Sequence, residues 1–271
     1  MSAAGGTGVI GLLCRTSERS DTAGSTNALV AAIAALAGVT PRIVGTPGEP
    51  ADSTYEEDLR DGRGCLLEAG GQLSDAFHEH RFPVLVAGTC SICATTLPVL
   101  ARDHPDAFVL WLDAHGDFNS PATSPSQFLG GMCLAGACGV WDTGLPGPAL
   151  DPSRVVMCGV RDIDPGEQVL LETYGVSRIE RPSRLADALA GREVFVHLDL
   201  DVLDPSVVDG FAFPVPGGFS AEGLRRMLAE VDEVATVIGI EITGCPSPEA
   251  AAMVAGCVAP LLNQTGNTIR P

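Results

Sequence analysis

Two short stretches of the chain concentrate potential metal ligands at alternate positions. Asp113, His115 and Asp117 lie in the sequence DAHGD, and Asp199 and Asp201 lie in DLD. Because a β-strand points residues i, i+2 and i+4 to one face, each set can converge at the end of a strand. Buried carboxylates gathered around one point would be very costly without cations. The pattern therefore predicts a dinuclear site for divalent metal ions.

Apolar runs lead directly into both acidic stretches. Val109–Leu112 precedes the first stretch and Val194–Val196 precedes the second. Acids in a solvated loop are the alternative interpretation, and the apolar runs disfavour it because they make the acids strand-end residues. Sites in open α/β sheets form at the carboxyl ends of the strands. We therefore expect both stretches at one edge of a parallel sheet.

The elements that must position these residues follow from the hydrophobic pattern. Strands are expected over Thr7–Leu13, Arg42–Val44, Val84–Ala87, Phe108–Asp113, Val155–Val160, Glu193–Leu200 and Val234–Ile242. Helices are expected over Thr26–Ala37, Thr54–His80, Ser91–Asp103, Pro165–Tyr174, Arg181–Ala190, Ser220–Glu230 and Pro248–Leu262. This alternation indicates a mostly parallel sheet flanked by helices on both faces. No linker divides the chain, so we expect a single α/β domain over residues 1–271.

Composition excludes several classes of partner. The net charge is −18, from 34 acidic and 16 basic residues, so nucleic acid and anionic lipid would be repelled. No apolar run is long enough to span a membrane, and Met1–Gly5 lacks the basic start of a signal peptide. The nine cysteines are irregularly spaced and do not indicate a disulfide framework. We therefore expect a cytoplasmic protein with buried free thiols.

The two acidic stretches closely resemble the signatures DAHxD and DxDxxDP of the ureohydrolase family, which includes arginases and agmatinases. A third segment, Gly159–Glu167, reads GVRDIDPGE and resembles the arginase segment RDxDPGE. The resemblance runs from Gly8 to Glu241 and implies a three-layer arginase-like fold. It also implies two Mn²⁺ ions that activate a bridging hydroxide for attack on the central carbon of a guanidine-like group.

The resemblance assigns a role to each ligand in the two stretches. Asp113 and Asp199 would bridge the two Mn²⁺ ions, Asp117 would bind one ion, and His115 and Asp201 would bind the other. Oxygen-rich ligation is typical of manganese rather than of thiophilic metals. Asp117 and Asp199 are therefore also candidates for direct involvement in catalysis.

One family ligand is replaced in this chain. The family carries a histidine in the motif GGDHS, and the corresponding stretch here reads AGTCS, which places Cys90 at the histidine position. A thiolate is a competent but soft ligand. Cys90 is therefore expected to bind the first metal while weakening its preference for manganese. The alternative is that Cys90 only lines the wall of the site.

The resemblance also indicates how an amino-acid head group would bind. Asp164 and Glu167 match arginase residues that hold the α-amino group, although acids at a helix N-terminus are the alternative interpretation. Asn119, Ser124 and Ser126 match polar contacts to the α-carboxylate, although they are also turn-forming residues. Together the matches favour an arginine-like amino acid over agmatine, which has no carboxylate.

Two further family positions are altered. The His-Gly pair of the catalytic loop falls on Gly130 and Gly131, so the histidine is missing. The family's guanidinium-binding glutamate falls on Gly244 when Glu241 occupies the preceding acid position. An alternative alignment gives Glu241 itself the guanidinium-binding role, which makes it a third catalytic candidate. Both glycines would leave room for an additional oxygen on the substrate.

These departures favour a hydroxylated guanidine as the substrate. The pattern is similar to the ureohydrolase variant that converts Nω-hydroxy-L-arginine to L-ornithine and hydroxyurea in D-cycloserine biosynthesis. One alternative is an ordinary ureohydrolase acting on L-arginine or on another guanidino or formimino acid. A second is a non-catalytic metal-binding protein on the same scaffold. The sequence does not predict the oligomeric state.

Overall fold

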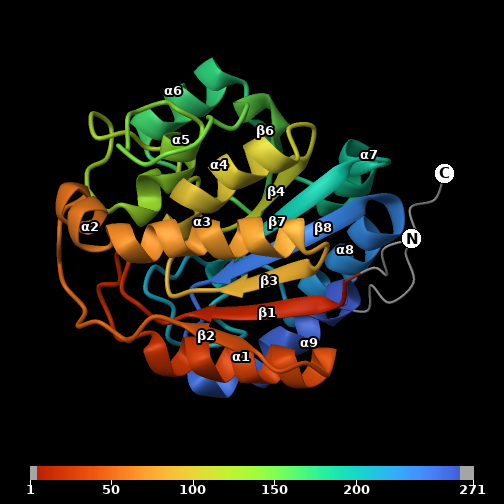
Figure 1. Cartoon of the computed structure of the whole chain (residues 1–271). Helices are drawn as coiled ribbons and strands as arrows, with labels where there is room; N and C mark the ends of the chain where they lie inside the picture. The colour runs from red at the N-terminus through yellow and green to blue at the C-terminus, as the bar shows by residue number, and fades with distance from the viewer. Residues whose placement is uncertain (1–4, 263–271) are drawn as a thin grey trace.

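An eight-stranded parallel sheet forms the centre of the molecule between two layers of helices (Figure 1). This computed structural model describes residues 5–262, so the ends of the predicted domain, 1–4 and 263–271, lie outside the described residues. The strand order is β2-β1-β3-β8-β7-β4-β5-β6. The strands are β1 (Thr7–Leu12), β2 (Arg42–Val44), β3 (Phe82–Val86), β4 (Phe108–Leu112), β5 (Val155–Cys158), β6 (Ser177–Ile179), β7 (Glu193–Asp199) and β8 (Thr236–Thr243).

Helices cover both faces of the sheet. Helices α1, α8 and α9 pack together on one face, and α3, α4 and α5 pack together on the other. The helices are α1 (Ala23–Ala37), α2 (Tyr55–Asp61), α3 (Arg63–His78), α4 (Cys93–Asp103), α5 (Cys133–Ala137), α6 (Pro165–Tyr174), α7 (Leu185–Leu189), α8 (Ala221–Val234) and α9 (Ala251–Leu262). This three-layer arrangement is the expected fold class.

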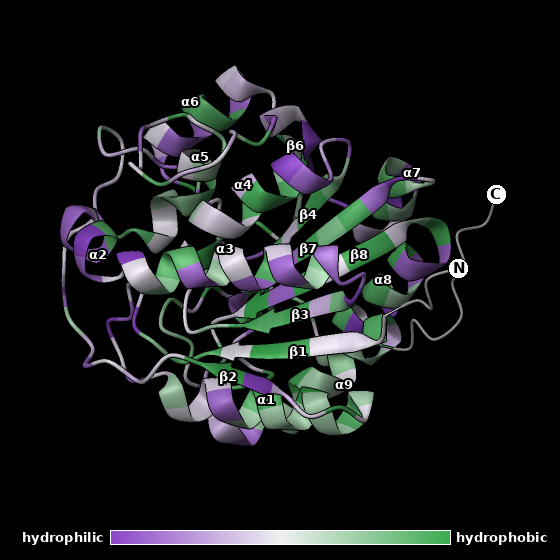
Figure 2. Ribbon diagram, in the orientation of Figure 1, coloured by the Kyte–Doolittle hydropathy of each residue, from purple (hydrophilic) through white to green (hydrophobic). Residues whose placement is uncertain are grey.

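The sheet separates two hydrophobic cores. One contains Val30 and Leu228 from the α1 and α8 side, and the other contains Leu73 and Leu97 from the α3 and α4 side. Every residue of β3 is buried, as the continuous apolar sequence of a central parallel strand requires. Figure 2 shows the same distribution, with hydrophobic residues along the central strands and hydrophilic ones on the outward faces of the helices.

Every expected strand is present, with its ends shifted by up to two residues. The expected helix over Thr54–His80 is two helices, because the chain turns at Gly62, where an added Cβ would lie 2.7 Å from the Thr16 carbonyl oxygen. The short edge strand β6 and helix α5 were not predicted. The two strands that carry the acidic stretches, β4 and β7, each end one residue earlier than expected.

The expectation that the cysteines are unpaired is wrong for two of them. Cys14, which follows β1, and Cys65, on α3, form a disulfide. The other seven cysteines are free and buried, as expected of core residues. Because two of the cysteines form a disulfide, the cysteine pattern no longer supports the expectation of a reducing compartment. Among residues 5–262, no helix combines the length and apolar character needed to cross a membrane.

Candidate metal centre

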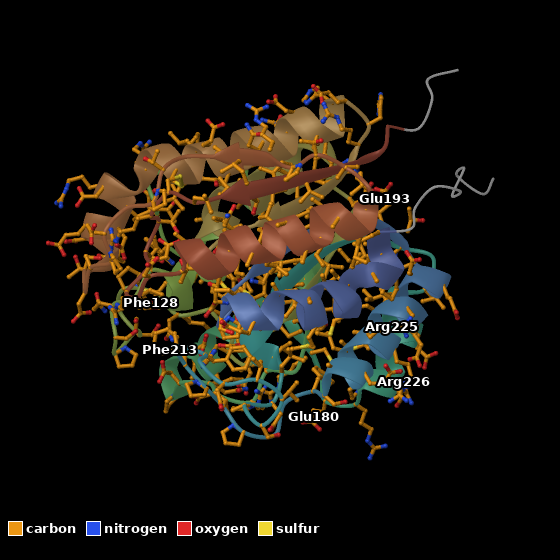
Figure 3. All side chains as sticks on the ribbon, turned by 90° about the horizontal axis from the view of Figure 1, so that it is seen from below. Phe128, Glu180, Glu193, Phe213, Arg225 and Arg226 are labelled. Carbon is orange, nitrogen blue, oxygen red and sulfur yellow. A yellow bond between two sulfur atoms is a disulfide. The ribbon has the colours of Figure 1, made fainter. Side chains whose placement is uncertain are left out.

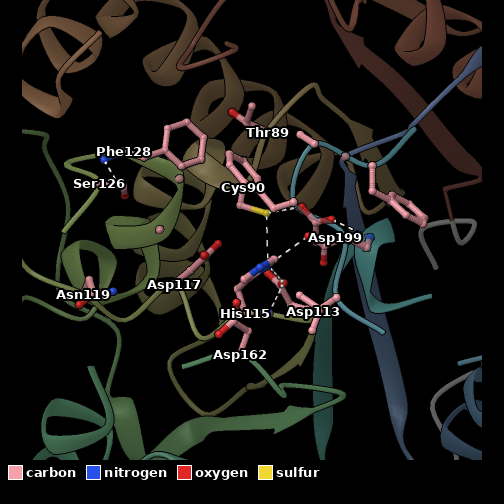
Figure 4. Close-up of a pocket in the computed structure, with 18 of the residues that line it drawn as sticks. Thr89, Cys90, Asp113, His115, Asp117, Asn119, Ser126, Phe128, Asp162 and Asp199 are labelled. Atoms are coloured by element: carbon pink, nitrogen blue, oxygen red, sulfur yellow. Dashed lines mark hydrogen bonds and ion pairs between the residues drawn. The ribbon is translucent and has the colours of Figure 1, made fainter. Parts of the chain in front are cut away.

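A cavity of about 500 Å³ opens at the carboxyl ends of β4 and β7, and Figure 4 shows the side chains that line it. All five residues of the two acidic stretches reach it, although the stretches are far apart in the sequence. The residues lining this cavity are Gly88, Thr89, Cys90, Asp113, His115, Asp117, Asn119, Ser126, Phe128, Gly130, Gly131, Asp162, Asp164, Glu167, Asp199, Asp201, Phe211, Ala212, Phe213, Pro214, Val215 and Gly244.

The first stretch converges on the cavity, but not as a continuous strand. β4 ends at Leu112, and Asp113 is the first residue of the loop that follows. The His115 backbone nitrogen donates a 2.7 Å hydrogen bond to Asp113 Oδ1, which curls the loop around this carboxylate. Asp117 then adopts a left-handed conformation, with φ of 49°. The simple strand alternation was therefore wrong beyond Leu112, although the convergence that it predicted is present.

The second stretch is the end of β7 followed by a 3-10 turn. Asp199 is the last strand residue, and the Asp201 backbone nitrogen donates a 2.9 Å hydrogen bond to Asp199 Oδ1. Asp201 faces the first stretch, because its Oδ1 accepts a 3.1 Å bond from the Ala114 backbone nitrogen. Its Oδ2 lies 3.1 Å from His115 Nδ1. Backbone donors therefore hold the two stretches in fixed positions relative to each other.

The cluster carries more negative charge than the protein itself compensates. Burial, followed by the nearby carboxylate of Asp201, raises the pKa of Asp199 to about 6, and burial together with Asp113 raises the pKa of Asp201 to about 6. Burial also raises the pKa of Asp117. Burial opposes the charge on His115, but Asp113 and Asp201 raise its pKa to about 12. Because only one imidazole faces four acids, the cluster has an excess of negative charge, which bound divalent cations would neutralise.

Cys90 joins this cluster from the other side of the cavity. It begins a 3-10 turn (Cys90–Ile92) soon after β3, and its Sγ lies 2.8 Å from Asp199 Oδ2 and 4.0 Å from Asp113 Oδ2. Burial, followed by the charge of Asp199, raises the pKa of the Cys90 thiol. The sulfur therefore lies beside the carboxylates that were predicted to share a metal with it. Metal binding by Cys90 remains a prediction.

The structure corrects the role considered for Glu241. This residue is fully buried and does not line the cavity. Its Oε1 lies 2.7 Å from His197 Nδ1, and its Oε2 accepts a 2.6 Å hydrogen bond from the Thr96 hydroxyl. Glu241 therefore cannot bind a guanidinium group in the cavity, because both oxygens already have partners beneath it.

His197 was missed by the sequence reasoning. It is fully buried, and its Nε2 lies 3.3 Å from Cys90 Sγ. Cys90, Asp113 and His197 place their ligand atoms within 4.8 Å of one another, as do Asp113, His115 and Asp201. The signal was present in the sequence, because His197 stands two residues before Asp199 in the same strand alternation.

Asp164 and Glu167, expected at the α-amino group, share one side of the cavity with Asn119, which was expected at the α-carboxylate. Asn119 Nδ2 donates a 2.9 Å hydrogen bond to Asp164 Oδ2, and Asn119 Oδ1 is buried without a partner among the described residues. Glu167 Oε1 accepts a 2.7 Å bond from the Phe118 backbone nitrogen, and its Oε2 caps the start of α6. Burial raises the pKa of Glu167 to about 7. The helix-capping interpretation is confirmed, and contact with a substrate remains a prediction.

The two serines expected at the α-carboxylate lie together, with their hydroxyls 3.5 Å apart, but only one of them lines the cavity. Ser126 lines the cavity. Ser124 does not, and its hydroxyl instead accepts a 3.0 Å hydrogen bond from the Gln127 backbone nitrogen. Ser124 therefore acts as a turn-forming residue, and its contact with a substrate remains a prediction. Phe128, from the same loop, was missed as a cavity residue.

Neither glycine leaves the free space that was expected. A Cβ added at Gly130 would lie 2.4 Å from the ring of Phe128, and one at Gly244 would lie 2.5 Å from Asp199 Oδ1. The volume beside Gly130 is thus taken by an aromatic ring. At Gly244, the absence of a side chain allows the chain to pass close to a candidate metal ligand.

The fold and the carboxylate cluster together define a metal-dependent hydrolase scaffold. The sequence pattern of the Arginase family matches residues 58–255, and the chain belongs to this family. Its fold is similar to that of the Bacillus cereus arginase, with a TM-score of 0.80 and 24% identity over 98% of this chain and 100% of that one. The Bacillus subtilis arginase gives a TM-score of 0.79 at 23% identity, covering 96% and 99% of the two chains.

Two curated relatives are more similar in sequence. The chain is 37% identical to the N(omega)-hydroxy-L-arginine amidinohydrolase of Streptomyces lavendulae over 234 residues, which cover 82% of this chain and 85% of the relative. It is 33% identical to the arginase of Bacillus caldovelox over 203 residues, which cover 66% and 68% of the two chains. The predicted family and fold class are therefore confirmed.

Proposed function

We propose that this protein hydrolyses Nω-hydroxy-L-arginine to L-ornithine and hydroxyurea. Water adds to the central carbon of the hydroxyguanidino group, the bond from this carbon to the side-chain nitrogen breaks, and that nitrogen leaves with a proton. The observation that carries the proposal is the cavity in which buried carboxylates meet Cys90 while position 244 offers no carboxylate. The similarity to an amidinohydrolase of this specificity supports it.

We infer that two Mn²⁺ ions bind between the two acidic stretches. The ligands would be Asp113, His115, Asp117, Asp199 and Asp201, joined by Cys90, all of which line the cavity. When bound, the ions would lower the pKa of the attacking water and act as Lewis acids. The backbone hydrogen bonds to Asp199 and Asp201 keep these carboxylates oriented toward the cavity.

Polar residues on the other side of the cavity would orient the amino acid. The unpartnered Oδ1 of Asn119 suits an N–H donor rather than the α-carboxylate first expected there, and the Asp164 carboxylate beside it suits the same ammonium group. Ser126 would donate to the α-carboxylate. At the cavity, the rings of Phe128 and Phe213 lie 5.5 Å apart, and Figure 3 shows both side chains together at the surface. They would limit the entry of water around a bound substrate.

Side-by-side substrate profiling tests this proposal. Purified protein reconstituted with Mn²⁺ is supplied with Nω-hydroxy-L-arginine, L-arginine or agmatine, and the release of ornithine or putrescine is measured with that of hydroxyurea and urea. We expect kcat/KM for the hydroxylated substrate to exceed that for arginine by at least about tenfold, which corresponds to about 1.4 kcal/mol of transition-state stabilisation.

Each other outcome contradicts a specific part of the proposal. Equal or better hydrolysis of arginine would show an ordinary ureohydrolase. Absence of turnover with less than about one bound metal per chain would show a non-catalytic protein, since the chemistry requires the metal pair. An Asp199→Asn variant serves as the inactive reference, because it removes a charged oxygen at the centre of the cluster.

A further inference from the structure

A second row of side chains lies directly beneath the candidate metal ligands. The strand register pairs Trp111 of β4 with His197 of β7, and His197 with Glu241 of β8. Each residue stands two positions before a residue at the cavity end of its strand, so it projects to the same face one step lower. The side chains of all three are fully buried. This polar supporting row is not used by the proposed chemistry.

The imidazole of His197 is held at one ring face and at both ring nitrogens. Its ring stacks on Trp111 with centroids 3.6 Å apart and planes 4° from parallel. Nδ1 lies 2.7 Å from Glu241 Oε1, and the Thr96 hydroxyl donates to the other carboxylate oxygen at 2.6 Å. The remaining nitrogen, Nε2, points at Cys90 Sγ at 3.3 Å. Rotation of the ring would break one of these contacts.

We propose that His197 is a positioning residue for Cys90. The Cys90 sulfur must reach the metal from a much shorter side chain than a histidine ligand has, and sulfur is a weakly directional hydrogen-bonding group. The contact from His197 Nε2, together with that from Thr243 Oγ1 at 3.0 Å, fixes the side-chain rotamer that places Sγ 2.8 Å from Asp199 Oδ2. Glu241 and Thr96 act through the ring by fixing its orientation. This inference rests on the metal-binding part of the proposed function.

A Co²⁺-substituted protein reports the sulfur directly. Thiolate bound to Co²⁺ gives a charge-transfer band in the near ultraviolet, and loss of this band in Cys90→Ser assigns it to the Cys90 sulfur. In His197→Gln and Glu241→Gln we expect the band to be weakened or shifted. Binding of Co²⁺, titrated by the same absorbance, should weaken by about 10- to 100-fold, as is typical when partners of metal ligands are changed.

Neighbouring threonines on α4 provide a matched control. Thr96→Val removes the hydrogen bond to Glu241 and should alter the band. Thr95→Val removes a hydroxyl whose partners within residues 5–262 are the backbone oxygens of Leu66 and Ile92, so the band should stay unchanged. A role in packing alone would make the two variants equivalent. Thermal unfolding of the metal-free proteins shows whether each variant is folded.

The outcomes separate this inference from the proposed substrate. An unchanged band in folded Glu241→Gln overturns the inference even if the His197 variant does not fold, because this change preserves the shape of the side chain. Absence of the band in the unaltered protein also overturns it, because Cys90 is then not a ligand. Hydrolysis of Nω-hydroxy-L-arginine could persist in that case, so the proposed function would stand independently.

Discussion

Gly244 decides how close the end of β8 comes to the metal ligands. Its φ is +70°, and an added Cβ would lie 2.5 Å from Asp199 Oδ1 and 3.0 Å from Oδ2. A glutamate introduced here to restore a guanidinium anchor would displace Asp199. We therefore predict that Gly244→Glu loses metal binding and hydrolysis of both substrates. Metal content after reconstitution and substrate profiling measure this, and a gain of arginine hydrolysis with full metal content would contradict it.

Gly175 provides the control for backbone strain. It ends α6 with a φ of +69°, and nothing lies within 4 Å of an added Cβ. Gly175→Ala should therefore cost about 1–2 kcal/mol of stability for its left-handed backbone and leave metal content unchanged. The difference between the two variants then isolates the collision with Asp199.

At the scale of elements, the start of α6 is tied to the loop that carries the first acidic stretch. The buried Glu167 carboxylate accepts hydrogen bonds from the backbone nitrogens of Phe118 and Asp164. Glu167→Gln places an amide donor against one of these donors, which costs about 1–3 kcal/mol. We predict a lower unfolding temperature and a higher KM for the amino acid. An analogue that lacks the α-amino group should lose less affinity in this variant.

Glu172→Gln is the matched control on the same helix. Glu172 is exposed, and its hydrogen bond comes from the Gln168 side chain at the surface. Neither the unfolding temperature nor the KM of the Glu172→Gln variant should differ measurably from that of the unaltered protein. If Glu167→Gln raises KM equally for the amino acid and for the analogue that lacks the α-amino group, Glu167 only stabilises the loop and its assignment to the α-amino group is wrong.

Strands with continuous burial were readily predicted from the sequence, and of the two exposed edge strands only the one with an apolar Ile-Val pair, β2, was predicted. β4 was recognisable because its sequence FVLWL is almost entirely buried. β6 was missed because Ser177 and Arg178 are exposed and carry no apolar signal. Among site residues, the position at the carboxyl ends of parallel strands correctly placed Asp113 and Asp199 at one edge of the sheet. The position of Glu241 depended on the β7–β8 register, which links it to His197 across a separation of 44 residues. No local pattern contains that information.

At the scale of the whole molecule, the buried acids make stability depend on pH and metal together. In the metal-free protein, burial raises the pKa of Asp199 and Asp201 to about 6 and that of Glu167 to about 7. In the unfolded chain the pKa of Asp and Glu is about 4. Between about pH 4 and 7 the folded state therefore binds more protons than the unfolded state. Stability therefore falls as pH rises through this window. The raised pKa of His115 continues this trend above about pH 6.5.

We predict that the metal-free protein unfolds at a lower temperature at about pH 8 than at about pH 5. Added Mn²⁺ should raise the unfolding temperature more at the higher pH, because deprotonated ligands bind it. Calorimetry at a series of pH values measures both effects. Asp199→Asn should flatten the pH dependence of the metal-free protein. Equal stability of the metal-free protein at the two pH values would contradict the prediction.

The contact between the supporting row and Cys90 also constrains how this site can evolve. Cys90 Sγ and His197 Nε2 lie 3.3 Å apart. A lineage that placed histidine at position 90 while keeping His197 would crowd two imidazoles into one space. A lineage that kept Cys90 and lost His197 would leave Thr243 and Asp199 as the partners of the sulfur and remove the contact from the supporting row. The two positions should therefore be exchanged together during descent, as a linked pair of substitutions rather than as independent ones.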